Sequence, residues 1–430
     1  METLSPAAAR TAPPAAQPPP QIPLPPSFPP GVDPATYRLR EVERLLKQAA
    51  YLPLFSVPNP ALPNRPIPLS LPFLPSLPFL ITAVEVNEQT HRFDVGAREA
   101  DGELSGIDRV GQPAATVGIR WTVIPDDFQA GPGRLPPPTI LNPFRSQRFE
   151  MLDGQFRFQD RAGSGFHGFG TGRTFPQPGS SYLAIGAVID VLEGFGQFRG
   201  MAGTVVVNGV IRPPDELAIN VMVRLMDPGG GMLTREPLSP LRPVPDPDPG
   251  STFMTFLGEP DPDRPVTLNL GPGGKILGSN VHELLRPVRL DFDDASGAVR
   301  SRAVEGPIVG RVDATLYFDP LAPQPVSPIQ TRDGVFTFFD REGRVAGTVR
   351  ANMVEGRAFR TPLAGAPMPV FRFGGFGPLL GGSGRFAGAG GMMTMNSAVS
   401  VFPRTLSNLY VLRFVDPVGR YRAAVGNADA

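Results

Sequence analysis

Four polar side chains stand within or beside apolar runs of the sequence, where a few polar groups can orient a small ligand. Asn208 follows three valines, and Asn396 follows a methionine-rich run. Arg224 and Arg413 each begin an Arg-x-x-Asp-Pro segment. An amide can hold a substrate carbonyl, and a guanidinium can bind a carboxylate through two parallel hydrogen bonds. The four residues are therefore candidates for a ligand site in an apolar pocket.

Each of these residues also has a structural interpretation, which we favour. Asparagine is preferred at strand ends and turns, where its side chain bonds to the backbone. Each arginine stands three residues before an aspartate, Asp227 or Asp416, and can brace the turn at the Asp-Pro step by pairing with it. Both interpretations remain open at the level of sequence.

Three further side chains are weaker candidates. Trp121 and Tyr317 lie in early strand-like runs of the two halves and would suit stacking on a flat ligand, although core packing is the commoner fate of such residues. His167 has the chemistry of an acid or base, but no nearby residue is a partner for it, so we expect a solvated turn. The segment 271–275 lacks the spacing of a phosphate-binding loop, and we reject that function.

The composition excludes several classes of protein. The 430 residues include 40 Lys and Arg and 40 Asp and Glu, so nothing draws the chain to nucleic acid or to an acidic membrane. There is no cysteine, and the three histidines are far apart, which argues against thiol chemistry and a metal enzyme. We expect no cofactor.

Three sequence landmarks occur twice in the same order. Segments 153–163 and 333–343 share Asp-Gly-x-Phe-x-Phe-x-Asp-Arg-x-Gly, and segments 196–203 and 384–391 share Gly-x-Phe-x-Gly-x-x-Gly. The Arg-x-x-Asp-Pro segments follow in both halves. This order predicts an internal duplication. Glycines around one phenylalanine are typical of a tight bend at the corner of a small closed barrel, with the ring held inside.

The first 80 residues differ from the rest. Residues 1–32 are rich in Pro and Ala, which predicts a disordered tail, and they lack the pattern of a secretory signal, which favours a cytoplasmic location. Asp33 and Pro34 begin a predicted short helix, in which Leu39, Val42, Leu45 and Leu46 recur at helical spacing. The prolines of 51–80 argue against a helix, a central strand and a membrane span, so 33–79 is predicted to hold this helix and an apolar arm. The arm is expected to wrap over the first barrel, or else to join a neighbouring subunit in a homo-oligomer.

The remaining sequence is strand-like, with no long helical periodicity. Short runs with partial alternation of apolar residues are separated by Gly, Pro and Asp. A segment rich in Pro, Asp and Gly, 231–264, is expected to be a linker. The predicted fold is all-β, with two tandem antiparallel β-barrels of about eight strands each, at 80–230 and 265–425.

The second glycine motif resembles the signature of the allene oxide cyclase and dirigent superfamily of eight-stranded barrels. Gly381-Gly-Ser-Gly-Arg-Phe-Ala-Gly-Ala-Gly-Gly391 matches its Gly-Gly-Ser/Thr-Gly-x-Phe-x-Gly-Ala-x-Gly pattern, and the first copy departs from the pattern at Phe195 and Met201. The resemblance spans roughly 150–226 and 330–417. It implies a barrel that binds a polyunsaturated or phenolic molecule in an apolar interior and steers cyclisation or coupling without a cofactor. The signature itself marks the fold and contains no catalytic residue.

Three functions follow as hypotheses. The first is a cofactor-independent barrel that binds an apolar small molecule and acts as a cyclase or isomerase. The second is a carrier that uses the same interior without turnover. The third is a structural or assembly protein with solid barrels, filled by Phe and Met, whose Pro-rich arm joins subunits.

Overall fold

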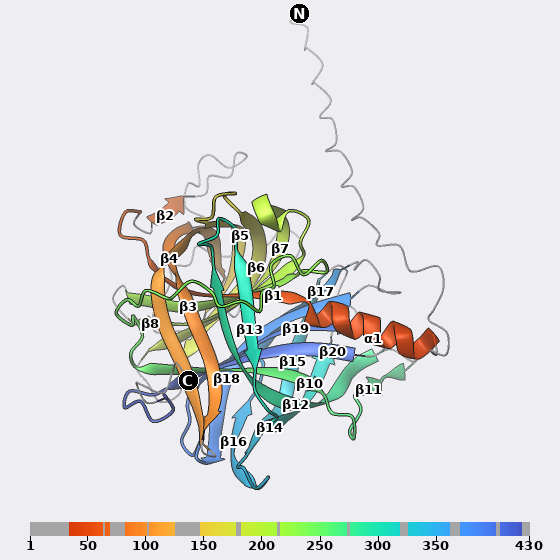
Figure 1. The fold of residues 1–430 in the computed structure, drawn as a ribbon. Helices are drawn as coiled ribbons and strands as arrows, with labels where there is room; N and C mark the ends of the chain where they lie inside the picture. The colour runs from red at the N-terminus through yellow and green to blue at the C-terminus, as the bar shows by residue number, and fades with distance from the viewer. Residues whose placement is uncertain are drawn as a thin grey trace, which may run out of the picture.

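The computed structural model describes residues 34–62, 65–68, 82–100, 103–124, 147–177, 182–212, 216–272, 276–318, 326–361, 370–400 and 405–423. These residues form an all-β protein of antiparallel strands with one α-helix (Figure 1). The predicted tail at 1–32 lies outside the described residues, as does much of the predicted arm. Among the described residues, no helix combines the length and apolarity needed to span a bilayer.

Eight strands from the first half pair in a closed ring, which we call ring one. In ring order, β1 pairs with β3, the chain then continues strand by strand to β9, and β9 returns to pair with β1. A short strand, β2, pairs with β3 outside the ring. The bounds are β1 Ala49–Pro58, β2 Arg65–Pro68, β3 Thr82–Ala100, β4 Glu103–Ile124, β5 Gln147–Phe158, β6 Gly165–Pro176, β7 Leu183–Phe195, β8 Gly203–Arg212 and β9 Glu216–Met226.

The second half forms a closed ring of the same order, ring two. Its order is β10, β12, β14, β15, β16 with β17, β18, β19 and β20, and β20 pairs with β10. Strands β16 and β17 share one position, because both pair with β15 and β18. The bounds are β10 Ser251–Pro260, β11 Thr267–Leu270, β12 Ile276–Asp293, β13 Arg300–Glu305, β14 Gly310–Phe318, β15 Val326–Phe339, β16 Val345–Ala351, β17 Glu355–Thr361, β18 Val370–Gly384, β19 Gly391–Ser400 and β20 Thr405–Val415.

The two glycine motifs lie at corresponding corners, between β7 and β8 and between β18 and β19. The phenylalanine of each motif is buried and packs on the second phenylalanine of the repeated Asp-Gly-x-Phe-x-Phe segment. The ring centroids of Phe198 and Phe158 are 5.2 Å apart, and those of Phe386 and Phe338 are 5.0 Å apart. Each glycine corner therefore holds one phenylalanine side chain inside the ring of strands to which the corner belongs, as the sequence predicts.

A pair of glycines at the second corner gives a matched test of this geometry. Gly384 and Gly388 both have positive φ angles, 57° and 76°. A methyl group on Gly384 would also collide with the backbone of Ala346, whereas nothing lies within 4 Å of one on Gly388. We expect Gly388→Ala to lower the free energy of unfolding by about 1 kcal/mol through backbone strain alone. Gly384→Ala should cost clearly more in urea denaturation, and equal losses would contradict the packed corner.

Two long hairpins lock the rings together. In Figure 1 the orange pair β3 and β4 crosses from the upper strands to the lower ones. Ala97 and Leu104, near the tip of that hairpin, belong to the core cluster of ring two, while Phe292 and Val299, near the tip of the β12–β13 hairpin, belong to that of ring one. Each ring therefore completes its core with side chains from the other half of the chain.

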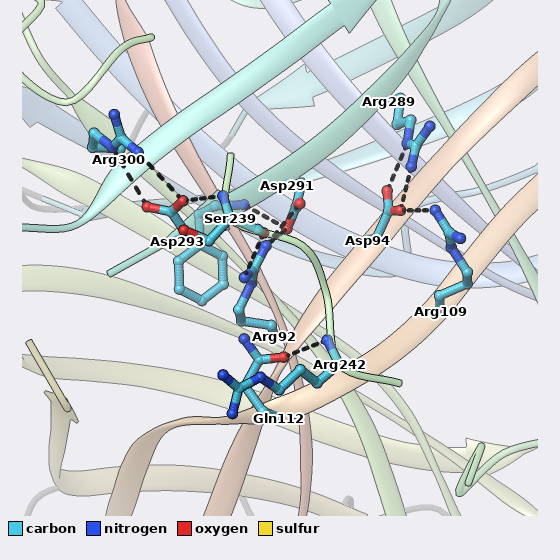
Figure 2. A network of polar contacts seen from close by, with 11 residues as sticks. Arg92, Asp94, Arg109, Gln112, Ser239, Arg242, Arg289, Asp291, Asp293 and Arg300 are labelled. Carbon is cyan, nitrogen blue, oxygen red and sulfur yellow. Dashed lines mark hydrogen bonds and ion pairs between the residues drawn. The ribbon is translucent and has the colours of Figure 1, made fainter. Parts of the chain in front are cut away.

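A polar network covers the crossing of these hairpins, where Gly96 of β3 pairs with Arg289 of β12. Figure 2 shows the buried carboxylate of Asp94 between Arg289, whose Nη2 lies 2.6 Å away, and Arg109, at 2.9 Å. Arg92, 1 % exposed, donates to both carboxylate oxygens of Asp291 and to the carbonyl of Ser239. The network fixes both hairpins and the segment that connects the two rings.

Two predictions about segments expected to lie outside the rings are wrong. Residues 51–58, expected in an arm that could not form a central strand, lie in β1, which pairs with both β3 and β9. The pairing with β3 begins only at Leu54, so Pro53 needs to fit only the ladder with β9. Residues 251–260, expected in a linker without a core, form β10, in which Met254 and Phe256 are fully buried.

The predicted helix is confirmed as α1, Pro34–Lys47. Val42, Leu45 and Leu46 face the protein and are buried, as their helical spacing predicts. The missing backbone N–H of Pro34 costs nothing in the first turn, which explains why the helix begins there.

Candidate functional site

The two asparagines lie between the rings. Along β8, Val205 and Val207 face the interior of ring one, so the alternation of a strand turns Asn208 outward, where it is buried against ring two. Its Nδ2 donates to the carbonyl of Met392 at 3.2 Å, and Asn396 Nδ2 donates to the carbonyl of Thr204 at 2.8 Å. The two amides therefore make reciprocal contacts across the boundary, as in an isologous interface.

Arg413 joins Asn208 at this boundary and is fully buried. Its Nε donates to Asn208 Oδ1 at 2.9 Å, and its Nη2 donates to Gln177 and to the carbonyl of Gly209. The nearest carboxylate, Asp248, lies 3.6 Å away. Burial lowers the pKa of Arg413 to about 10, although Asp248 opposes this shift.

Arg224 meets Asn396 in the corresponding place, with backbone carbonyls in place of a carboxylate. Its guanidinium donates to the carbonyls of Asn396 at 2.9 Å, Ser407 at 2.7 Å and Leu46 at 3.0 Å. The last of these belongs to the C-terminal turn of α1, whose dipole favours a cation. Burial lowers the pKa of Arg224.

Neither arginine braces its own Asp-Pro turn, so that interpretation is wrong. The carboxylate of Asp227 accepts from the backbone N–H of Met232 at 2.7 Å, and that of Asp416 accepts from Tyr421 at 2.8 Å. The structure brings Asn208 together with Arg413, and Asn396 together with Arg224, at the contact between the rings. None of the four points into the interior of its ring.

The other sequence candidates separate from one another. Tyr317 is 39 % exposed on β14, with Arg332 over its ring. His167 lies within β6 rather than in a turn, next to Gln155, because the Gly-rich segment 165–176 continues as a strand. Trp121 on β4 is buried in ring one, and its ring lies 4.3 Å from that of Phe149. It is the candidate that leads to a cavity.

A cavity of about 30 Å³ lies inside ring one. Aromatic, aliphatic and thioether side chains form most of its wall, and Glu88 is the one titratable group among the described residues that line it. The lining residues are Val86, Glu88, Val117, Ile119, Trp121, Phe149, Met151, Phe156, Ile185, Ala187, Ile189, Val207, Ile219 and Val221. A cavity of this size has room for about two water molecules.

Glu88 is a buried carboxyl group without a cation beside it. The residue is 3 % exposed, and burial raises the pKa of its carboxyl to about 7. The Ser56 hydroxyl lies close enough to Glu88 to lower this pKa in part. Its distance and angles do not meet the criteria for a hydrogen bond, so Ser56 Oγ has no partner among the described residues. At neutral pH the carboxyl therefore exists in both protonation states.

Three buried polar atoms of other residues in ring one have no hydrogen-bond partner within the described part of the chain. They are Ser56 Oγ, Thr90 Oγ1 and Trp121 Nε1. Ser56 and Thr90 pair directly across β1 and β3, on the face that Glu88 shares. A buried polar atom left unpaired costs about 1–3 kcal/mol, so such a group of atoms calls for water or a polar ligand.

Ring two has a carboxyl group in the corresponding position, but there it is satisfied. Glu283 pairs opposite Pro260, as Glu88 pairs opposite Pro58. Tyr410 Oη donates to Glu283 Oε2 at 3.1 Å, and the Asn408 amide donates to Oε1. Burial raises the pKa of Glu283 to about 8, against the effect of these two hydrogen bonds.

A larger hollow of about 570 Å³ lies outside both rings, where α1, β10 and β13 meet. Its wall carries charges of both signs, and Glu259 there lies 2.6 Å from Lys47 and 3.3 Å from Arg286. Compensated charges at an open surface single out no ligand, so the buried cavity of ring one is the better candidate site.

Reasoning from sequence missed Glu88, although a signal was present. Val84, Val86 and Glu88 alternate with polar residues along β3, so strand periodicity places Glu88 on the apolar face. Among the described side chains, no group of three or more His, Cys, Asp or Glu is placed to hold a metal ion. Comparison of the chain with protein-family models, with curated proteins and with solved structures finds no match.

Proposed function

We propose that this protein binds a small, mostly apolar molecule inside ring one, with the Glu88 carboxyl as the polar group that orients it. The observation that carries the proposal is a buried carboxyl without a cation that lines an apolar cavity, in the ring that also holds the unpaired polar atoms of Ser56, Thr90 and Trp121. Mostly apolar walls with a few convergent polar groups are typical of small-molecule sites. A ligand larger than water must displace side chains, and the flexible Met151 is the lining residue best suited to move.

Glu88 also supports acid–base chemistry on the bound molecule. A carboxyl with a pKa of about 7 can both take and give a proton at neutral pH. One such group is sufficient for an isomerisation or cyclisation in which it removes a proton from one atom and returns it to another. Turnover would make the protein a cofactor-independent cyclase or isomerase, and binding without turnover would make it a carrier.

A structural role fits ring two better. Phe256, Phe338 and Phe386 pack together inside it, and its carboxyl is hydrogen-bonded by its own side chains. We propose that ring two is a solid support, which holds ring one through the exchanged hairpins and the Arg–Asn contacts.

The proposed architecture is a pair of tandem β-barrels that arose by internal duplication and resemble the allene oxide cyclase and dirigent superfamily. Support comes from the same strand order in both rings, from the corresponding positions of the glycine corners, and from the reciprocal contacts of Asn208 and Asn396. The relationship supports a ligand inside one ring and specifies none of the chemistry.

Trp121 makes the proposal directly testable, because it is the single tryptophan of the chain and lines the cavity. Titration with a small apolar probe such as methylcyclohexane should change its emission in a saturable way. Ala187→Val narrows the cavity and should weaken binding of the probe about tenfold or more. Each methylene of the probe that can no longer be buried costs about 0.8 kcal/mol, and the added bulk of valine also blocks the probe sterically. Tyr410→Phe in ring two is the matched control and should bind as the wild type does. An emission that does not saturate, or binding that Ala187→Val leaves unchanged, would exclude ring one as the site.

A further inference from the structure

We infer that the ligand of ring one is a neutral molecule with a hydroxyl group on a compact apolar body, and that ring two shows the bound arrangement with its own side chains. This inference rests on the proposed function and adds the chemical class of the ligand. It comes from comparing the positions around Glu88 and Glu283, one by one.

The two carboxyl groups have the same neighbours in the strand lattice. Glu88 pairs with Val117 on the next strand, and Glu283 pairs with Val312. On the first strand of each ring, Ser56 pairs with Ile219 of the last strand, and Gly258 pairs with Asn408. Two residues further along the last strand of each ring stand Val221 and Tyr410.

In ring two these last-strand residues complete the site. The Tyr410 hydroxyl is at once a donor to Glu283, at 3.1 Å, and an acceptor from Asn408 Nδ2, at 3.2 Å. A glycine at 258 leaves room for the carboxyl, because a methyl group there would collide with it. The aromatic body of Tyr410 fills the apolar space in front of the carboxyl group and contacts Phe336, whose ring lies 5.1 Å away.

In ring one the same two positions hold Ile219 and Val221, which contribute no polar atom and line the cavity. Ring one therefore lacks two things that Tyr410 provides in ring two: a hydroxyl group beside the carboxyl, and an apolar side chain that carries this hydroxyl. A ligand that restores both would also lie beside Trp121, which lines the cavity and whose Nε1 has no partner among the described residues. The cavity is therefore the space of a missing side chain, and a small alcohol has the complementary chemistry.

A neutral ligand fits this cavity better than a charged one. A carboxylate would face Glu88 with no cation among the described lining residues to bind it. An ammonium group would lose its hydration in an apolar enclosure, against a carboxyl that burial keeps partly protonated. The hydroxyl of Tyr410 shows that a neutral donor satisfies the equivalent carboxyl.

Three probes of similar size separate these classes: cyclohexanol, methylcyclohexane and cyclohexylamine, titrated calorimetrically into the full-length protein. We expect the affinity ratio of cyclohexanol to methylcyclohexane to fall about tenfold in Glu88→Leu, because that variant loses one hydrogen bond to an ionisable group. An unchanged ratio, or tighter binding of cyclohexylamine than of cyclohexanol, would overturn the inference that the ligand carries a hydroxyl group. Ring one would then still be the binding site. Failure of all three probes to bind the wild type would overturn the proposed function together with this inference.

Exchange of the two last-strand residues between the rings gives a gain-of-binding test. Asn408→Ile with Tyr410→Val should create a second cavity in ring two and raise the number of bound cyclohexanol molecules from one to two. Ile219→Asn with Val221→Tyr, combined with Ser56→Gly to give the room that Gly258 gives in ring two, should satisfy Glu88 internally and abolish binding. A ring-two double variant that folds, as judged by circular dichroism, and still binds one cyclohexanol would contradict the equivalence of the two sites.

Discussion

Arg413→Ala is expected to destabilise the protein by about 3–5 kcal/mol, the usual cost of removing one partner from a buried charged network. The substitution removes the donor to Asn208 Oδ1 and to Gln177 Oε1 in the contact between the rings, while Asp248 keeps its ion pair with Arg212. Because each ring packs the hairpin tip of the other into its core, the loss should appear in one cooperative unfolding transition. Urea denaturation followed by circular dichroism measures both the size of the loss and the number of transitions.

Two companion variants sharpen this result. Arg344→Ala removes a guanidinium that is 74 % exposed and should leave the free energy of unfolding nearly unchanged, because solvent screens its ion pairs. Arg413→Lys keeps the charge but cannot reproduce contacts made by three guanidinium nitrogens, so we expect little rescue. A folded Arg413→Ala protein of nearly normal stability would contradict a structural role and return this arginine to ligand binding.

Glu88→Gln is expected to stabilise the protein at pH 8 and above and to change the shape of its pH profile. The folded-state pKa of Glu88 is about 7 and the ordinary value is 4.5, so the native state binds the proton more tightly. The contribution of Glu88 to stability is therefore complete below about pH 4.5, falls as the pH rises, and levels off above about pH 7. A shift of this size corresponds to about 3 kcal/mol, which Gln, neutral at every pH, does not lose.

The difference between the wild type and Glu88→Gln isolates this one group. Burial also raises the pKa values of Asp108 and Glu283, so the wild-type profile alone mixes several titrations. Both proteins share those titrations, which cancel in the difference. The exposed Glu305→Gln is the matched control for replacing a carboxyl by an amide at the surface. A flat difference for Glu88→Gln would mean that Glu88 is ionised like a surface carboxylate.

Much of the fold can be predicted from local patterns. The helical spacing of Val42, Leu45 and Leu46 predicts α1, and the Gly-x-Phe-x-Gly-x-x-Gly motifs predict two corners with buried rings. Both signals are local, because they depend on the 3.6-residue period of a helix and on backbone angles open to glycine. The helix and the all-β class needed no knowledge of distant contacts.

The elements that were missed depend on partners far away in the sequence. Pro53 argues against a central strand, yet the staggered pairing of β3 leaves it outside that ladder. The hairpin exchange that joins the rings has no signature in a single segment. By sequence, Asn208 and Arg413 are candidates for a ligand site because they are polar within apolar strands, and in the structure these apolar surroundings are the contact between the rings. Strand periodicity shows that a residue faces apolar neighbours. It does not show whether those neighbours lie inside a ring or in the contact between the rings.

The central claim, a ligand site in ring one built around Glu88, is tested most directly by fluorine NMR of protein labelled with fluorotryptophan. The chain has one tryptophan, so a single resonance reports on Trp121 in the cavity wall. We predict that this resonance moves with a midpoint near pH 7 in the wild type and stays fixed in Glu88→Gln, and that saturating cyclohexanol shifts it in the wild type. A resonance whose chemical shift changes neither with pH nor with the alcohol would mean that Glu88 does not titrate near pH 7 and that the cavity does not bind the alcohol, which contradicts the account.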